Sequence, residues 1–271
     1  MAKYLSCLPN QNAGVGHQFI GWASAYSLAD MYGLTFAYQP FGFFEEFLPF
    51  GDNEIKYSEL NLSIINVPRF DFLTERDVLE SAITKAPGDS IIHLEVDQFI
   101  PWARLSVTKL KAKYTNRTGG KNILASHIRR GQIMQWTPEE REGRFLPNDY
   151  FVNVIKQVKS VSPNIESHIY SMGQPGEFTE FSGDTHFHLS KDENDFEGTC
   201  EALRAMINAD ILVMSRSGMS YMAGILSNGI NIVHPFWTMI SNFSPSPDTV
   251  SPPRDWIQCD INGNFDTERL K

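Results

Sequence analysis

The chain has 271 residues, of which 42% are hydrophobic and 20% charged, a composition typical of a globular protein with a sizeable buried core. The formal net charge of −9 argues against nucleic acid or an anionic membrane as its partner. The sequence shows no membrane span, no signal peptide and only three widely spaced cysteines, so we expect a cytoplasmic protein.

The chain begins with the pattern of a strand, a glycine-containing loop, a helix and a second strand. We expect strands at residues 3–8 and 34–38 and a helix at residues 17–32. Gly14 and Gly16 lie in the predicted loop, where they would let backbone N–H groups approach an anion at the helix N-terminus. This order predicts one βαβ unit at the start of the chain.

An aromatic-rich segment follows at residues 41–57, with five phenylalanines and the acidic residues Glu45 and Glu46 between them. Aromatic rings suit either a hydrophobic core or a platform for a sugar ring. Both interpretations stay open, and we favour the core.

A polar, glycine-containing run at residues 115–121 follows a predicted strand at 90–96 and a predicted helix at 102–114. We take this run as a linker between two domains. The predicted domains are residues 1–118 and residues 119–271.

The second half of the chain alternates between strand and helix patterns. Strands are predicted at residues 122–128, 167–172, 185–189, 210–214 and 231–234, and helices at 148–160, 198–209 and 217–227. Asn148 is expected to cap the first of these helices. Such alternation predicts an α/β domain with a mostly parallel sheet and helices on both faces.

Two adjacent arginines follow the first strand of the second half, in the segment His127-Ile128-Arg129-Arg130-Gly131. Side chains alternate along a strand, so His127 and Arg129 should share one face of the sheet and Arg130 the other. Ligands bind at the carboxyl ends of strands in open α/β sheets, and a guanidinium matches the oxygens of a phosphate. The pair is therefore either a diphosphate clamp or two surface arginines in salt bridges.

Three segments resemble one family in the expected order: residues 14–19 (GVGHQF), 127–131 (HIRRG) and 209–217 (ADILVMSRS). They are similar to motifs of the α1,6-, α1,2- and protein-O-fucosyltransferases. The resemblance implies the GT-B fold, with two Rossmann-like lobes and the donor site in the second. It also implies an inverting, metal-independent glycosyltransferase that needs no cofactor besides its nucleotide-sugar donor.

The resemblance assigns donor binding to a set of glycines, basic residues and serines. These residues are Gly14, Gly16, His127, Arg129, Arg130, Ser215, Ser217 and Ser220. The chain contains no D-x-D carboxylate pair for a metal–diphosphate complex. Arg129 and the turn at Ser215, Ser217 and Ser220, called the serine turn below, would therefore have to neutralise the leaving diphosphate. We therefore expect no metal site.

The expected reaction moves a sugar from a nucleotide-diphosphate sugar, GDP-fucose first, to a hydroxyl group of a glycan acceptor. Gln132 stands where the family usually has an acidic residue, and only Glu201 lies near the position that reads guanine. A UDP-sugar such as UDP-xylose is therefore an alternative donor, as for a xylosyltransferase. A non-catalytic module that binds nucleotide sugars or glycans is the alternative from another class.

An inverting transfer needs a general base near the acceptor hydroxyl. In the α1,6 group the base lies five residues before a proline that opens a helix, and this count back from Pro147 gives Glu142. Glu139 and Glu140 lie in the same loop and keep the register open. Asp97 and Glu46 are weaker candidates from the first half.

Two histidines, His186 and His188, alternate on a predicted strand. They form a possible metal pair, but no third ligand follows at a useful spacing. We expect them on a solvent-facing strand edge instead.

Overall fold

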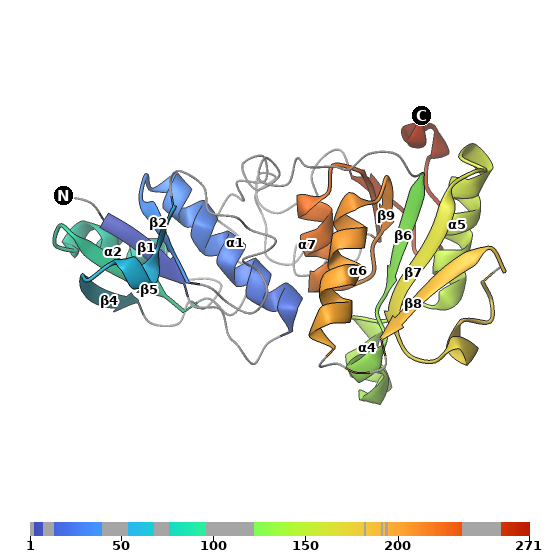
Figure 1. Cartoon of the computed structure of the whole chain (residues 1–271), viewed down its shortest axis with the longest axis horizontal. Helices are drawn as coiled ribbons and strands as arrows, with labels where there is room; N and C mark the ends of the chain where they lie inside the picture. Colours follow the sequence, from blue (N-terminus) through green and yellow to red (C-terminus); the bar gives the residue numbers. More distant parts are fainter. Residues whose placement is uncertain are drawn as a thin grey trace. The chain divides into compact units, whose positions relative to one another are not determined.

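A computed structural model of the chain shows two compact α/β units, each built on its own parallel sheet (Figure 1). One unit comprises Met1–Lys113 with Asn242–Ser251, and the other comprises Tyr114–Ser241 with Pro252–Lys271. The structure describes residues 3–7, 14–39, 54–67, 76–95, 122–181, 183–190, 192, 195–234 and 256–271. The α/β fold class is confirmed.

Several predictions from the sequence fall outside these described residues. They are the linker at 115–121, the domain boundary between 118 and 119, the helix at 102–114 and the base candidates Asp97 and Glu46. Most of the aromatic segment 41–57 also lies outside them.

The sheet of the first unit has five parallel strands in the order β3-β2-β1-β5-β4. The strands are β1 (Lys3–Cys7), β2 (Thr35–Tyr38), β3 (Glu54–Lys56), β4 (Ser63–Val67) and β5 (Ser90–Leu94), with helices α1 (Val15–Met31) and α2 (Arg76–Lys85) and the 3-10 helix η2 (Tyr57–Glu59). The βαβ unit at the start of the chain is confirmed. The sequence analysis did not predict β3, β4 or α2.

Helix α1 packs on strand β2 through an aromatic cluster. The Trp22 ring stacks on Tyr26 and meets Phe36 and Tyr38 edge-on, with ring centroids 5.4 to 6.3 Å apart. Such edge-on contacts suit the ring quadrupole. Trp22, Phe36 and Tyr38 are almost completely buried, so this cluster is the core between α1 and the sheet.

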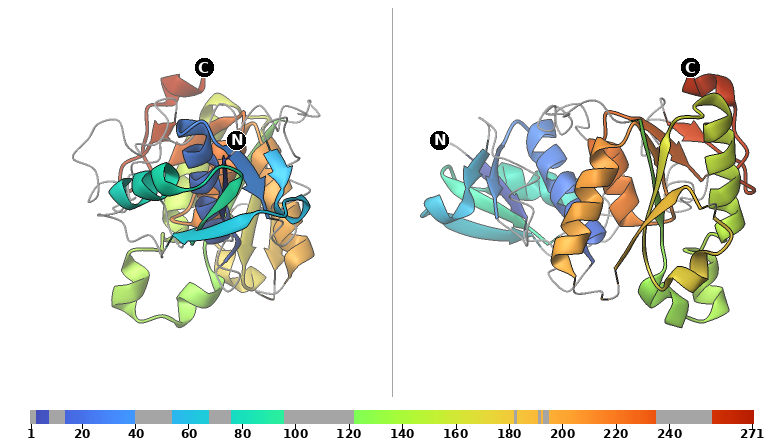
Figure 2. Two further views of the ribbon diagram at one scale, coloured as in Figure 1. Left: turned by 90° about the vertical axis from the view of Figure 1, so that its left-hand side faces the viewer. Right: turned by 45° about the vertical axis from the view of Figure 1, so that its right-hand side comes forward.

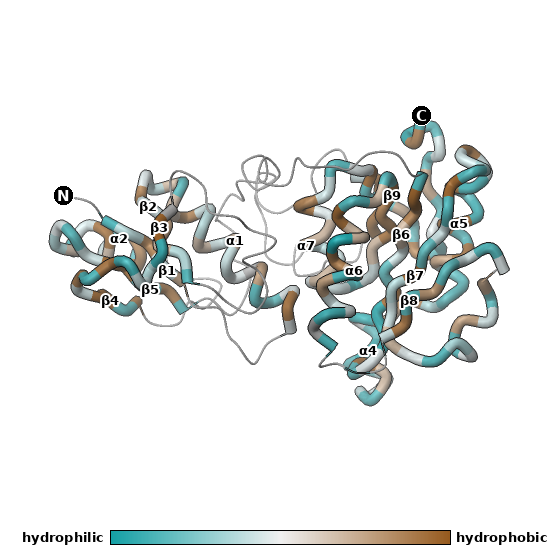
Figure 3. Tube along the Cα trace, in the orientation of Figure 1, coloured by the Kyte–Doolittle hydropathy of each residue, from teal (hydrophilic) through white to brown (hydrophobic). Residues whose placement is uncertain are grey.

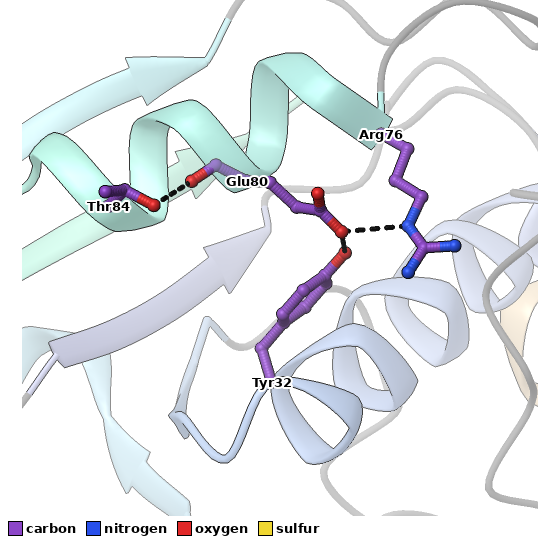
Figure 4. A network of polar contacts seen from close by, with 4 residues as sticks. All are labelled: Tyr32, Arg76, Glu80 and Thr84. Carbon is purple, nitrogen blue, oxygen red and sulfur yellow. Dashed lines mark hydrogen bonds and ion pairs between the residues drawn. The ribbon is translucent and has the colours of Figure 1, made fainter.

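The end of α1 is joined to α2 by polar contacts around Glu80 (Figure 4). Tyr32, which caps α1, donates a hydrogen bond of 2.9 Å to Glu80 Oε1, and Arg76 Nε donates one of 2.8 Å to the same oxygen. Gly33 follows with φ of +64°, a left-handed conformation that favours glycine and ends the helix where the sequence predicts. These contacts therefore join the C-terminal end of α1 to α2.

The sheet of the second unit has six parallel strands in the order β11-β10-β9-β6-β7-β8. The strands are β6 (Ile123–Ile128), β7 (Glu166–Met172), β8 (Thr185–Ser190), β9 (Ile211–Val213), β10 (Ile230–Val233) and β11 (Ile257–Gln258). The helices are α4 (Pro138–Glu142), α5 (Asn148–Val161), α6 (Phe196–Asn208) and α7 (Gly218–Leu226), with 3-10 helices η3 (Gly131–Gln135), η4 (Pro175–Phe178) and η5 (Thr267–Leu270). The chain runs outward from β6 to β8 and then returns to β9, so the strand order reverses between β6 and β9.

The six-stranded sheet has helices on both faces, and its hydrophobic residues are concentrated in the inner strands β6 and β9 (Figures 2 and 3). Helix α5 lies on one face, while α6 and α7 pack together on the other. The buried stripe of α5 has helical spacing: Tyr150, Phe151, Val154, Ile155 and Val158. It packs in one core cluster with Leu124 and Ile128 of β6, so even-numbered residues of β6 point towards α5.

The predicted cap of α5 is wrong in detail. Pro147 holds the N-cap position, and Asn148 is the first helical residue. The Asn148 side chain contacts Arg130 and the backbone carbonyl of Glu177, and these long-range partners determine its position.

The two histidines of β8 lie on a strand edge, as predicted. Strand β8 is the outer strand of its sheet, and His186 and His188 are exposed. Their rings stack with His168 of β7 at centroid distances of 4.8 and 5.3 Å. Within the described ranges, no three histidine, cysteine or acidic residues are arranged to hold a metal ion.

None of the described helices has the length and apolar character needed to cross a membrane.

Candidate functional site

The reversal of strand order in the second unit brings two predicted segments together. Ser126 of β6 pairs with Val213 of β9, so the residues that follow each strand emerge side by side at the carboxyl edge. Open α/β sheets bind ligands at such a switch point. His127 to Arg130 come from one strand end and Ser215 to Ser217 from the other.

His127 is buried beside the serine turn. Its Nδ1 lies 3.1 Å from Ser215 Oγ, and its side chain is 9% exposed. Burial, followed by the charges of Arg129 and Arg130, lowers the pKa of His127 to about 3. The imidazole is therefore neutral at pH 7, with one nitrogen able to donate a hydrogen bond and the other to accept one.

Arg129 is a half-buried cation on the same face as His127. Its Nη1 donates to the backbone carbonyl of Arg216 at 3.4 Å, and its guanidinium carbon lies 5.8 Å from the centre of the Trp136 ring. Burial and the nearby charge of Arg144 lower the pKa of Arg129 to about 10, so it remains protonated at pH 7. No carboxylate in the described part of the chain forms an ion pair with it, and an anionic ligand would fill that role.

Arg130 points to the opposite face, as the alternation predicts. Its Nη2 donates to Asn148 Oδ1 at 2.5 Å, its Nη1 donates to the Arg129 carbonyl at 2.8 Å, and its guanidinium carbon lies 4.4 Å from the centre of the Phe145 ring. The side chain is 8% exposed. These contacts suit a residue that supports the strand end, and direct contact between Arg130 and a donor stays a prediction.

The three serines after β9 build the turn into α7. Ser217 caps the helix, because its Oγ accepts a hydrogen bond of 3.2 Å from the Met219 N–H. The Ser220 hydroxyl donates to the carbonyls of Ser215 and Ser217 and is completely buried. Ser220 therefore shapes the turn, whereas Ser215 and Ser217 lie where the helix N-terminus would meet an anion.

The acidic segment expected to be a loop is the short helix α4, which contains the candidate bases. Glu140 forms a capping box with Thr137, in which its carboxylate accepts a hydrogen bond of 3.0 Å from the Thr137 N–H. Glu139 and Glu142 are exposed. The backbone carbonyl of Glu142 accepts a hydrogen bond from Arg216, which connects this end of α4 to the serine turn. Glu142 remains the predicted base.

Two basic residues of this region were not predicted from the sequence. Arg216 stands between the serines of the turn, and Arg144 follows α4. Both are half-buried, and burial lowers the pKa of each guanidinium. A cation between two turn serines is a signal that could have identified Arg216, but Arg144 lies in a loop without a motif.

The glycines Gly14 and Gly16 belong to the first unit. Gly14 is the N-cap of α1, and its carbonyl accepts hydrogen bonds from the N–H groups of His17 and Gln18. Gly16 lies inside the helix and is buried, so its predicted place in the loop is wrong. The helix begins two residues earlier than predicted, because Val15 and Gly16 already adopt helical geometry. Donor binding by Gly14 and Gly16 stays a prediction.

The chain was compared with known proteins by sequence and by structure. No family model and no curated protein matches it. The fucosyltransferase NodZ from Bradyrhizobium matches its structure with a TM-score of 0.50 at 15% identity, over 84% of this chain and 93% of NodZ. NodZ α-1,6-fucosyltransferase soaked with GDP-fucose matches with a TM-score of 0.47 at 15% identity, over 83% and 92% of the two chains. POFUT1 in complex with GDP matches with a TM-score of 0.44 at 9% identity, over 84% and 96%.

The similarity to NodZ from Bradyrhizobium is one of fold. It extends over most of both chains and includes both α/β units. The two-lobed fold implied by the sequence resemblance is therefore confirmed.

Proposed function

We propose that the chain is a glycosyltransferase that moves a sugar from a nucleotide-diphosphate sugar to a hydroxyl group of a glycan acceptor. The observation that carries this proposal is the position of Arg129 at the switch point. It is a half-buried cation beside the serine turn, and no carboxylate of the described residues pairs with it. The fold shared with the fucosyltransferase NodZ supports the same activity class.

The donor diphosphate would bind between Arg129 and the turn that opens α7. Cleavage of the glycosidic bond leaves additional negative charge on this diphosphate. A guanidinium and helix N–H groups stabilise that charge more strongly in the transition state than in the ground state. The absence of a D-x-D pair from the sequence supports metal-independent transfer by this route.

The acceptor hydroxyl would lose its proton to Glu142 as it attacks the sugar carbon from the side opposite the leaving group. This geometry inverts the configuration at that carbon. Glu142 is exposed at the end of α4, and its backbone is hydrogen-bonded to Arg216 of the serine turn. This backbone contact keeps Glu142 on the segment next to the serine turn, and its exposed carboxylate is chemically able to act as a general base.

GDP-fucose is the first candidate donor, because three sequence segments and the fold match fucosyltransferases. A UDP-sugar is the second candidate. Gln132, which replaces an acidic residue of the family motif, is exposed and carries no charge. The non-catalytic alternative keeps the same donor site without turnover.

A thermal-shift panel of GDP, UDP and ADP, followed by their sugar conjugates, tests the proposal. A ligand at about 100 times its dissociation constant should stabilise the protein by roughly 2.7 kcal/mol. We expect the largest shift with GDP and release of GDP from GDP-fucose when a glycan acceptor is added. Stabilisation by a UDP-sugar alone would identify a UDP-sugar as the donor in place of GDP-fucose. Binding without turnover would support the non-catalytic module. No shift with any nucleotide would refute donor binding.

A further inference from the structure

The guanidinium of Arg216 fastens the segment after α4 to the serine turn. Its Nη1 donates to the carbonyl of Glu142 at 2.5 Å and lies 3.5 Å from the carbonyl of Phe145. These two carbonyls bracket Arg144. The carbonyl of Arg216 itself accepts a hydrogen bond from Arg129. Backbone and guanidinium contacts therefore connect Arg129, Arg216 and the loop that carries Arg144.

Arg144 brings a second positive charge to the side of Arg129. Arg144 is half-buried, and the Arg216 guanidinium holds the backbone on both sides of it beside the turn that Arg129 contacts. The Arg144 charge also lowers the pKa of Arg129. Across the described ranges, no carboxylate forms an ion pair with either guanidinium. Two like charges that are partly removed from water repel each other unless an anion lies between them.

We propose that Arg144 is a second anion-binding residue beside Arg129, that the two guanidiniums together bind a diphosphate, and that Arg216 positions Arg144. This inference rests on the proposed function and extends it by adding a second cation to the diphosphate site. A diphosphate has oxygens on two neighbouring phosphorus atoms, so one guanidinium can bind each phosphate. Guanidinium groups bind such oxygens through paired N–H donors.

The probes are inorganic pyrophosphate, GDP, UDP and GMP, each titrated by calorimetry into the full chain and into single variants. Arg144→Ala removes charge-assisted hydrogen bonds, so it should weaken pyrophosphate and both nucleoside diphosphates by about 10- to 100-fold. GMP should lose less, and the preference for GDP over GMP should shrink. Arg144→Lys should restore only part of the loss, because an ammonium lacks the bidentate fork.

Arg141→Ala is the matched control. Arg141 lies three residues before Arg144 in the same segment, and among the described residues its hydrogen bonds involve its backbone alone. This variant removes the same charge as Arg144→Ala. If the position of the charge and not the net charge decides binding, pyrophosphate affinity should stay within about twofold of the wild type. Equal losses in Arg141→Ala and Arg144→Ala would overturn the proposal.

The role of Arg216 is tested by a double-mutant cycle. If Arg216 acts by holding Arg144 in place, Arg216→Ala should weaken pyrophosphate, and the double variant should bind no worse than Arg144→Ala alone. Losses that simply add would show that Arg216 does not act through Arg144. Circular dichroism and the melting temperature of each variant check folding, and Arg216→Lys provides a second substitution should Arg216→Ala unfold.

The outcomes separate this inference from the proposed function. Binding of pyrophosphate that depends on Arg144, without turnover of any nucleotide sugar, would keep the diphosphate site and refute the transferase. Turnover of a nucleotide sugar with unchanged pyrophosphate and GDP affinity in Arg144→Ala would keep the transferase and overturn the inference. Failure of the wild-type chain to bind pyrophosphate, GDP or UDP would overturn both.

Discussion

The neighbouring residues Arg129 and Arg130 have different environments. Arg130 has an amide, a carbonyl and a phenyl ring around its guanidinium, and the carboxylates of Glu177 and Glu180 partly offset the effect of burial on its pKa. Arg129 has only a backbone carbonyl and the Trp136 ring among its described contacts. Alternation along β6 accounts for this difference. The residue that faces α5 is held by protein groups, and the residue that faces the serine turn retains capacity for a ligand.

The buried His127 should make stability depend on pH. Its folded-state pKa of about 3 lies below the usual 6.5, so between these values the unfolded chain binds a proton that the folded chain does not. The neutral His127 therefore lets the folded state keep its full stability above pH 6.5, and the free energy of unfolding decreases as the pH falls from 6.5 towards 3. Denaturant unfolding between pH 4 and 8 should therefore show a shallower pH dependence for His127→Asn than for the wild type. His234→Asn should also reduce the slope, because burial lowers the pKa of His234 to about 4. Identical slopes for the wild type and His127→Asn would contradict a neutral His127.

Glu142 should be needed for turnover and not for donor binding. Glu142→Gln keeps the size of the side chain and removes its ability to accept a proton. Turnover should fall by about two to four orders of magnitude, while the donor dissociation constant stays nearly unchanged. Glu140→Gln is the control, because that carboxylate caps α4. Full activity in Glu142→Gln combined with inactivity of an Asp97 or Glu46 variant would move the base to the first half of the chain.

The turn between β9 and α7 combines structural and binding roles in one short element. The Ser220 hydroxyl donates to the backbone carbonyl of Ser215, Ser217 caps the helix, and Ser215 contacts His127. The turn leaves the N-terminus of a nine-residue helix directed at the carboxyl edge of β6. This arrangement places the positive end of the helix dipole where the proposed leaving group gains charge.

Ser217→Ala should affect both stability and binding. Loss of the N-cap hydrogen bond should cost about 1 kcal/mol of unfolding free energy. Loss of the hydrogen bond from this hydroxyl to the diphosphate should separately weaken binding of the nucleotide sugar by about 1.5–3 kcal/mol, measured by calorimetry. A stability loss without any change in donor affinity would leave Ser217 as a helix cap alone.

Elements with a strong hydrophobic pattern could be predicted from the sequence, and short or context-dependent ones could not. The runs that became β6 and α5 carry unbroken strand and helix spacing and are confirmed within one or two residues. Strand β3 has three residues and α4 has five, too few for a periodic signal. Arg216 depends on a carbonyl 74 residues earlier in the chain, a contact that no local pattern contains.

At the scale of the whole molecule, the alternating strand and helix patterns in each half of the sequence predict the two α/β units. Alternating strands and helices predict parallel sheets, and both described sheets are fully parallel. The reversal between β6 and β9 could not be predicted, because strand order depends on which strands pair across the sheet. That reversal brings the HIRRG segment beside the serine turn and makes the two sequence motifs one candidate site.

Metal independence is a prediction about the proposed transfer reaction. Arg129 and the helix N-terminus should stabilise the leaving diphosphate without a divalent cation. Activity in excess EDTA should therefore stay within about twofold of the untreated value. Loss of activity that manganese restores would show that a metal, and not the arginine, stabilises the leaving group.

Steady-state kinetics of Arg129→Ala test the central claim most directly. The interaction with the leaving diphosphate strengthens as the glycosidic bond breaks, so kcat should fall more than donor affinity. Arg129→Lys should recover only part of the activity, and Arg130→Ala should lose less than Arg129→Ala, with circular dichroism confirming that each variant folds. A folded Arg129→Ala enzyme with near wild-type kcat would contradict the assignment of this site to glycosyl transfer.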